Sequence, residues 1–173
     1  VAEHLFSVLE HAAVARGRCT LAIPGGRSPG PVLGALAAMS TPLLRARLHL
    51  LWVDERAVPP GHEDRNDLAT LAAWRAGGPL PAQVHPIPAE DPDAPAAYAA
   101  TLADATGGEA LDAVLLGIGE DGHVASLFPE HPGLDEFDPV FALADSPKPP
   151  PRRVTLSLAV LRAARCKVVL ALG

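Results

Sequence analysis

The sequence predicts an α/β protein of the Rossmann-like type, with three α/β/α layers built around a mainly parallel sheet. Short apolar runs alternate with segments whose apolar residues recur at helical spacing, and this alternation is typical of right-handed βαβ units. The clearest runs, at 19–24, 48–53 and 112–116, are almost continuously apolar, as in strands covered on both faces. With 173 residues, 49% of them apolar and 20% charged, the chain has the size and composition of one folded domain.

The N-terminal half is expected to hold three helices and two strands. Apolar residues at helical spacing predict a helix over 2–16, which Gly17 ends. A helix over 29–39 is expected to begin at Pro29, with Ser28 as its N-cap. The other elements expected here are strands at 19–24 and 48–53, a Pro-rich loop at 54–65 and a helix at 67–74.

The C-terminal half continues the alternation. A helix over 94–105 ends at Gly107 and Gly108, and the strand at 112–116 runs into a glycine-rich loop. Prolines make 147–151 a stiff extended segment, and 154–161 is ambiguous between strand and helix. The other elements expected here are short strands at 84–87 and 140–143, a helix at 159–164 and a last strand at 166–172.

Charge and composition narrow the class of partner. The net charge of −6 argues against nucleic-acid binding, because few cations are available to neutralise phosphates. No apolar run approaches the roughly 18–20 residues of a membrane span, so we expect a soluble, cytoplasmic protein without a membrane partner. Cys19 and Cys166 each adjoin a predicted strand and are expected to be free thiols. A monomer or a small homo-oligomer is expected.

Ligands of open α/β sheets bind outside the carboxyl ends of the strands, and the first such segment here is PGGRSP at 24–29. Gly25 and Gly26 let the backbone approach a ligand, and the helix that follows adds a partial positive charge, so the segment suits an anion. Ser28 and Arg27 are possible further donors. A tight turn between strand and helix, with no ligand, explains the same glycines.

The second and third segments carry charged side chains at strand ends. Asp54 and Arg56 follow the run at 48–53, and a guanidinium there could bind a phosphate or carboxylate; an ordinary solvated loop is the alternative. The third segment, LLGIGEDGH, places His123 two residues after Asp121. Histidine suits proton transfer near neutral pH, and a nearby carboxylate can orient it. The histidines follow no metal-binding spacing, so no metal or cofactor is expected.

Together these segments resemble the 6-phosphogluconolactonase family, within the sugar-phosphate isomerase, deaminase and lactonase superfamily. The matching motifs, in order, are GGRSP, LLWVDERAVPP with RND, LDAVLLGIGEDGHVASLFPEHPGL and SPKPPPRRVTLSLAVL. The resemblance covers about residues 20–165 and implies a cofactor-independent hydrolysis of 6-phosphogluconolactone to 6-phosphogluconate, in the oxidative pentose phosphate pathway.

The resemblance also implies roles for individual residues. His123 would be the general base that activates water, and Asp121 would orient it. The remaining residues expected to bind the sugar or its phosphate are Gly25, Gly26, Ser28, Asp54, Arg56, Gly119 and Arg153. Family members continue for several dozen residues after the last strand, so we expect 1–173 to be a single domain that lacks its C-terminal portion.

Two alternatives remain open at this point. A glucosamine-6-phosphate deaminase or isomerase shares the glycine loop and the DGH segment. Those enzymes, however, resemble DEY where this chain has DER, and AFNEP where it has ASLFP. A sugar-phosphate-binding domain without catalytic activity is the other alternative.

Overall fold

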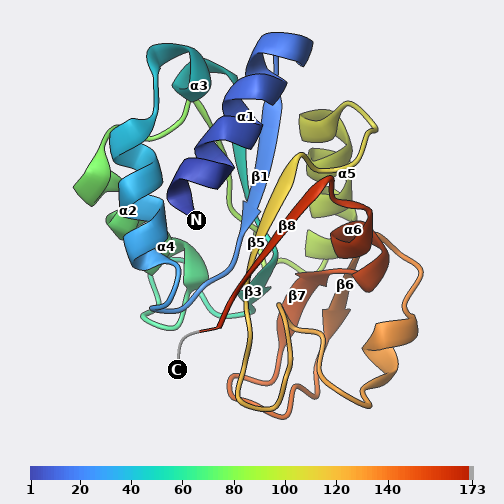
Figure 1. The fold of residues 1–173 in the computed structure, drawn as a ribbon. Coiled ribbons are helices and arrows are strands. Elements are labelled where there is room, and N and C mark those ends of the chain that lie inside the picture. The colour runs from blue at the N-terminus through green and yellow to red at the C-terminus, as the bar shows by residue number, and fades with distance from the viewer. Residues whose placement is uncertain (172–173) are drawn as a thin grey trace.

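The computed structural model describes residues 1–171, and it has a five-stranded parallel sheet between helices and a second, small sheet (Figure 1). Helices α1 to α4 lie on the left of the large sheet in Figure 1, and α5 and α6 lie on its right. The helices are α1 (Ala2–Arg16), α2 (Gly30–Met39), α3 (Pro42–Arg47), α4 (Asn66–Gly77), α5 (Ala94–Thr106) and α6 (Leu158–Ala163), with a 3₁₀ turn at Pro132–Asp135. The predicted fold class is confirmed.

The large sheet has the strand order β4-β2-β1-β5-β8, and every pairing in it is parallel. Its strands are β1 (Cys19–Ile23), β2 (Leu48–Trp52), β4 (Gln83–His85), β5 (Ala113–Gly117) and β8 (Cys166–Leu170). Strand β1 is central and buried along its whole length, as its uninterrupted apolar run predicts. The carboxyl ends of β1, β2 and β5 meet at the lower edge of the sheet in Figure 1.

The small antiparallel sheet is the main departure from the predicted fold. It has the order β3-β7-β6, formed by β3 (Asp54–Arg56), β7 (Arg153–Leu156) and β6 (Val140–Leu143). Val53 joins the two sheets, because its N–H donates to Ile23 and its carbonyl accepts from the N–H of Leu156, at 2.9 and 2.8 Å. The segment 54–56, expected to be loop, is therefore a strand held at the carboxyl ends of β1 and β2.

Several local expectations were wrong in detail. Ser28 does not cap α2, which begins one residue later than expected after Pro29 and has no side-chain cap. Helix α3 was not expected, although Thr41 caps it through a 3.1 Å bond from the N–H of Leu44 and Pro42 follows at its first turn. The ambiguous segment 154–161 divides into β7 and the start of α6. The last strand ends at 170, and residue 172 of the prediction lies outside the described residues.

Both cysteines are free, as expected. Burial raises the pKa of Cys19 to about 12, which makes this thiol unreactive near neutral pH. Within residues 1–171, no helix has the length and apolar character needed to cross a membrane.

Candidate active site

A cavity of about 200 Å³ opens at the carboxyl ends of β1, β2 and β5. The sheet brings together segments from four parts of the chain here, including β7 of the small sheet. The residues that line the cavity are Pro24, Gly25, Gly26, Ser28, Asp54, Arg56, Asn66, Gly117, Ile118, Gly119, His123, Ala125 and Arg153. Every residue that we expected to bind the sugar phosphate is among them, and Asp121 contacts His123 from outside the lining.

The two positions directly after β1 require glycine for different structural reasons. Gly26 has φ +84°, in the left-handed region that favours glycine. Gly25 instead lies directly against the side chain of Asn66, and a Cβ atom at position 25 would overlap the Asn66 amide. The backbone of the loop after β1 therefore packs directly against the side chain of Asn66 at the start of α4.

Asp54 forms the buried floor of the cavity and is 5% exposed. Its carboxylate accepts hydrogen bonds from Asn66 Nδ2 at 3.2 Å and from Ser126 Oγ at 2.6 Å. Arg153 Nη1 lies 3.8 Å from Oδ2 of the same carboxylate. Asp54 thus ties β3 to α4, to the loop after β5 and to β7, so its position is determined by three neighbouring segments.

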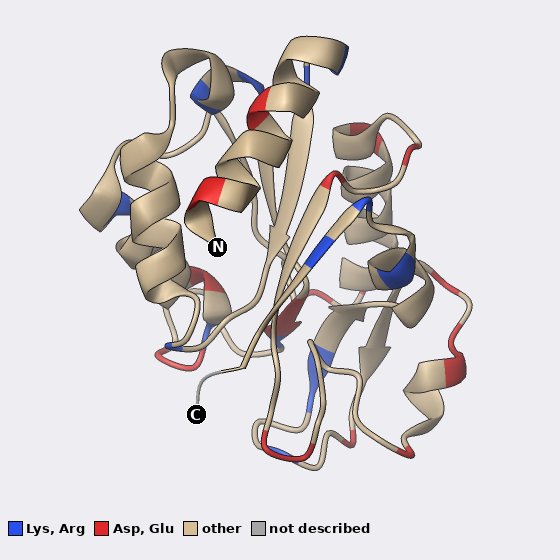
Figure 2. Cartoon of the chain, viewed as in Figure 1, with Lys and Arg blue, Asp and Glu red and all other residues tan. Residues whose placement is uncertain are grey.

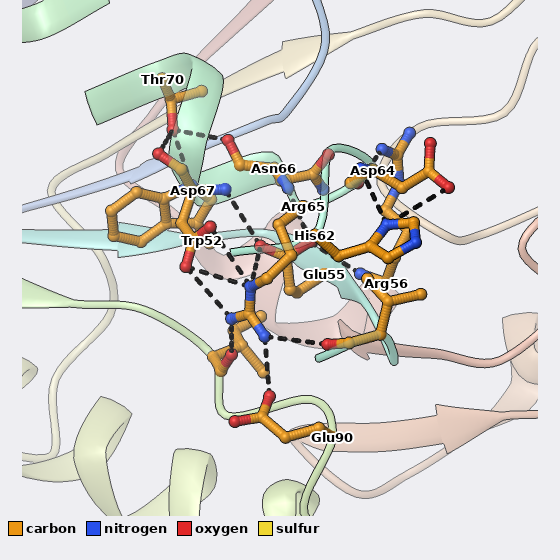
Figure 3. Close-up of polar contacts among 12 residues, drawn as sticks. Trp52, Glu55, Arg56, His62, Asp64, Arg65, Asn66, Asp67, Thr70 and Glu90 are labelled. Atoms are coloured by element: carbon orange, nitrogen blue, oxygen red, sulfur yellow. Dashed lines mark hydrogen bonds and ion pairs between the residues drawn. The ribbon is translucent and has the colours of Figure 1, made fainter. Parts of the chain in front are cut away.

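Glu55, the next residue, is fully buried and does not line the cavity, and Figure 3 shows its polar contacts. Its Oε1 accepts from the backbone N–H groups of Arg56 and Asn66, both at 2.8 Å, and its Oε2 accepts from the N–H of Asp67 at 3.0 Å. Helix α4 has no side-chain cap of its own, so Glu55 caps it from the neighbouring strand. Burial raises the pKa of Glu55 to about 7, while the N–H donors and Arg65 oppose that rise.

Arg65 completes the support beneath Arg56. Its guanidinium is 4% exposed and lies 3.9 Å from Glu55, 3.1 Å from Asp67 and 2.7 Å from Glu90. Figure 3 shows the guanidinium of Arg65 among the side chains of Glu55, Asp67 and Glu90. The buried cation compensates for the buried charge of Glu55, and both hold the backbone on which Arg56 is carried.

Arg56 presents a cation with unused donors to the cavity. Nη1 donates to the carbonyl of Asp64 at 2.6 Å. Nε is buried and has no hydrogen-bond partner, and within residues 1–171 no ion pair neutralises the guanidinium. A guanidinium that lines the cavity without a counter-ion favours an anion there, bound through its Nη atoms rather than through the solvent-excluded Nε.

His123 and Asp121 form a hydrogen-bonded pair on the loop after β5. His123 Nδ1 lies 2.5 Å from Asp121 Oδ1, and the His123 side chain is 19% exposed. The hydrogen bond from His123 holds the pKa of Asp121 at about 2. Donation from Nδ1 to the ionised carboxylate leaves the lone pair of the imidazole on Nε2.

The surroundings of His123 fix the plane of its ring. The ring packs against Phe128, with centroids 4.7 Å apart. The N–H of Gly119 donates to the carbonyl of His123 at 2.9 Å, and a Cβ atom at 119 would overlap the His123 ring. Ala125, two residues further on, has φ +51°, an uncommon conformation outside glycine. The loop is closely folded around the imidazole.

Arg153 lies at the cavity but directs most of its donors elsewhere. Nε donates to the carbonyl of Pro150 at 3.1 Å, and Nη2 donates to those of Lys148 and Pro149 at 3.0 and 3.2 Å. Only Nη1 turns toward Asp54. The side chain thus holds the Pro-rich loop that precedes β7.

Arg27, Arg56, Arg152 and Arg153 do not form one cluster. Arg56 and Arg153 line the cavity, whereas Arg27 is exposed away from the lining and Arg152 lines a separate hollow. A roomier hollow of about 320 Å³ lies between α5 and α6, but apolar side chains dominate its lining and Glu109 is its one ionisable group. Of these two cavities, the one at the strand ends therefore holds a histidine together with a carboxylate and two guanidinium groups.

Sequence reasoning missed Asn66, Ser126 and Glu55 as parts of this site. Asn66 stands at the start of a helix, where it reads as an ordinary capping residue. Ser126 lies three residues after His123, in a motif that supported the family resemblance but to whose serine we assigned no role. Glu55 stands beside Asp54 and Arg56, and strand alternation would have placed it on the opposite face had 54–56 been predicted as a strand.

Comparison with known protein families shows to which class this protein belongs. Residues 1–173 match the family described as glucosamine-6-phosphate isomerases/6-phosphogluconolactonase. The chain belongs to this family.

Similar proteins within the family include several 6-phosphogluconolactonases. A 6-phosphogluconolactonase of Streptomyces coelicolor is 40% identical over 189 residues, which covers 99% of this chain and 72% of the relative. The human 6-phosphogluconolactonase is 41% identical over 175 residues, covering 93% of this chain and 66% of that protein. The crystal structure of the Thermotoga maritima 6-phosphogluconolactonase superposes with a TM-score of 0.86 at 27% identity, over 97% of this chain and 76% of that one.

Proposed function

We propose that this protein is a 6-phosphogluconolactonase (EC 3.1.1.31), which hydrolyses 6-phosphogluconolactone with His123 as general base. The activity is supported by about 40% identity to named lactonases over nearly the whole chain. The observation that carries the mechanism is that one cavity holds both His123 and Arg56: within residues 1–171, His123 Nε2 makes no hydrogen bond and the Arg56 guanidinium has no counter-ion.

The phosphate of the substrate is assigned to Arg56 and the loop after β1. The guanidinium of Arg56 lines the cavity and has no ion-pair partner within residues 1–171. Gly26 and Ser28 lie on the same wall at the N-terminus of α2, where the helix dipole favours an anion. Gly25 serves the close approach of Asn66, and Arg153 contributes at most its Nη1, since its other donors hold the Pro-rich loop.

The chemistry follows from the imidazole. His123 Nε2 removes a proton from water while the water oxygen attacks the lactone carbonyl carbon. The tetrahedral intermediate collapses with cleavage of the bond from that carbon to the ring oxygen, and the imidazolium returns its proton to this oxygen. Lactone and water thus give the open-chain acid. Asp121 holds Nδ1–H throughout and stabilises the imidazolium, and Gly119 leaves room for the imidazole ring of His123.

The test is the hydrolysis of freshly generated 6-phosphogluconolactone, with the spontaneous rate subtracted. His123→Ala is expected to lower kcat by about 10²–10⁴-fold, the usual contribution of a positioned base. His11→Ala, on the exposed face of α1, is the matched control and should match the wild type. A His123→Ala variant that retains most of the wild-type rate would overturn the assignment of the base.

The same preparation separates the alternatives. A deaminase or isomerase would release ammonia or form a ketose from glucosamine 6-phosphate, which we expect not to react. A binding domain without activity would leave the lactone at its spontaneous rate while still being stabilised by the product, 6-phosphogluconate.

A further inference from the structure

One of the two lysines of this chain reaches the catalytic pair. Lys148 Nζ lies 3.3 Å from Asp121 Oδ1, the oxygen that is also 2.5 Å from His123 Nδ1. In Figure 2 the acidic tip of the loop after β5 lies next to a basic segment of the loop that precedes β7. A cation, an anion and an imidazole are thus arranged in series at the mouth of the cavity.

The backbone that carries Lys148 is held in place from below. Arg153 is 5% exposed, and its Nε and Nη2 donate to the carbonyls of three successive residues, 148, 149 and 150. Ser146 Oγ donates to the carbonyl of Lys148 at 2.8 Å. A buried guanidinium that is committed to one short loop fixes the point from which the lysine side chain extends.

We propose that Lys148 is a positioning residue of the reaction, which acts on His123 through their shared partner Asp121. The inference rests on the proposed function, in which His123 is the base. The ammonium group draws part of the negative charge of Asp121 to itself. Asp121 then stabilises the imidazolium less strongly than a carboxylate without this neighbour would.

The other charged groups near His123 are the same in the wild type and in a variant at position 148. Those that line the same cavity come from β3 and β7 and are Asp54, Arg56 and Arg153. Glu120 precedes Asp121 on the exposed tip of the loop. The hydrogen bond from His123, with a smaller contribution from Lys148, holds the pKa of Asp121 at about 2, so this carboxylate stays ionised throughout the range to be tested.

The experiment compares Lys148→Met, Lys148→Arg and the wild type by their pH profiles of kcat/KM from pH 5 to 8. Lys148→Met should move the midpoint of the acidic limb to higher pH by about half a unit, as for two charges roughly 6 Å apart in water-like surroundings. This corresponds to an activity about threefold lower at the acidic end. Lys148→Arg keeps the charge and should retain the wild-type profile. Lys167→Met, which changes the other lysine of the chain on β8, is the matched control and should also retain it.

Three results would overturn the inference. The Lys148→Met profile could superimpose on the wild type; it could fall equally at all pH values with an unmoved limb, as for a merely structural role; or Lys148→Arg could shift as far as Lys148→Met. His123→Ala separates this from the proposed function. If His123→Ala is inactive and the Lys148→Met limb is unmoved, only this inference fails, whereas an active His123→Ala variant contradicts the proposed base itself.

Discussion

Replacing Glu55 by Ala should destabilise the protein far more than a change at any exposed glutamate. Its carboxylate accepts hydrogen bonds from the backbone N–H groups of Arg56, Asn66 and Asp67, at 2.8, 2.8 and 3.0 Å. Each buried donor left without a partner costs about 1–3 kcal/mol. Allowing for water that enters the space vacated by the side chain, we expect a loss of about 3–6 kcal/mol at pH 5.

The loss should depend on pH in a defined direction. Burial raises the pKa of Glu55 from 4.5 to about 7, so the folded state holds this proton more tightly than the unfolded state does. The associated stability is complete below pH 4.5 and is lost as pH rises through 7. At about 1.4 kcal/mol per pKa unit, this pKa shift corresponds to roughly 3 kcal/mol of stability. The difference between wild type and Glu55→Ala should therefore shrink by about that amount between pH 4.5 and 8.

Urea unfolding followed by tryptophan fluorescence measures both effects. Trp52 is buried, and its Nε1 donates to Thr70 of α4 at 3.0 Å, so the signal reports on the helix that Glu55 caps. Glu90→Gln is the control, because Glu90 also contacts Arg65 but has a 35% exposed side chain and should change stability by less than about 1 kcal/mol. A Glu55→Ala loss no larger than that of the control would refute the capping argument, and a loss independent of pH would refute the charge argument.

Three further outcomes are expected. Gly25→Ala should displace the amide of Asn66 and lower both stability, by about 2–4 kcal/mol, and activity; urea unfolding and the hydrolysis assay check this, and unchanged values would contradict the close packing. Ser126→Ala removes a 2.6 Å hydrogen bond to the buried Asp54 carboxylate and should cost about 1.5–3 kcal/mol, whereas a neutral effect in the same unfolding experiment would show that the bond contributes little. Burial lowers the pKa of His85, so the contribution of this residue to stability is complete above pH 6.5 and is lost as the pH falls. Thermal unfolding of His85→Gln should therefore show a smaller drop in Tm from pH 7.5 to 5.5 than the wild type shows. Parallel Tm curves for the two proteins would contradict this prediction.

The parts of the site that follow long apolar strands were predictable from sequence. Strands at 19–24, 48–53 and 112–116 were expected from their uniform apolar character, and the rule that ligands bind beyond carboxyl ends placed Gly25, Asp54 and His123 at one edge. The structure brings all three to one cavity. Local pattern and a general topological rule were sufficient, because each of these segments follows a strand that is buried on both faces.

The parts that depend on long-range packing were not predictable in the same way. The sequence DER at 54–56 is polar and short, and only its pairing with β7, nearly a hundred residues later, makes it a strand. Arg153 was expected to help bind the sugar or its phosphate, but nothing in the sequence predicted that it would be buried and would bind backbone carbonyls. Its surroundings come from the arrangement of the Pro-rich loop, which no periodicity in the sequence encodes.

The central position of β1 also has a consequence for how activity should appear during refolding. The cavity forms only when β1 has paired with β2 on one side and with β5, from the far half of the chain, on the other. Contacts between segments so distant in sequence form slowly, because closing large loops costs entropy before the pairing compensates for it. Partly folded chains that contain only the β1–β2 half would thus lack His123 at the site altogether. The recovery of lactonase activity after dilution from denaturant is expected to follow the slowest kinetic phase rather than the appearance of helical signal.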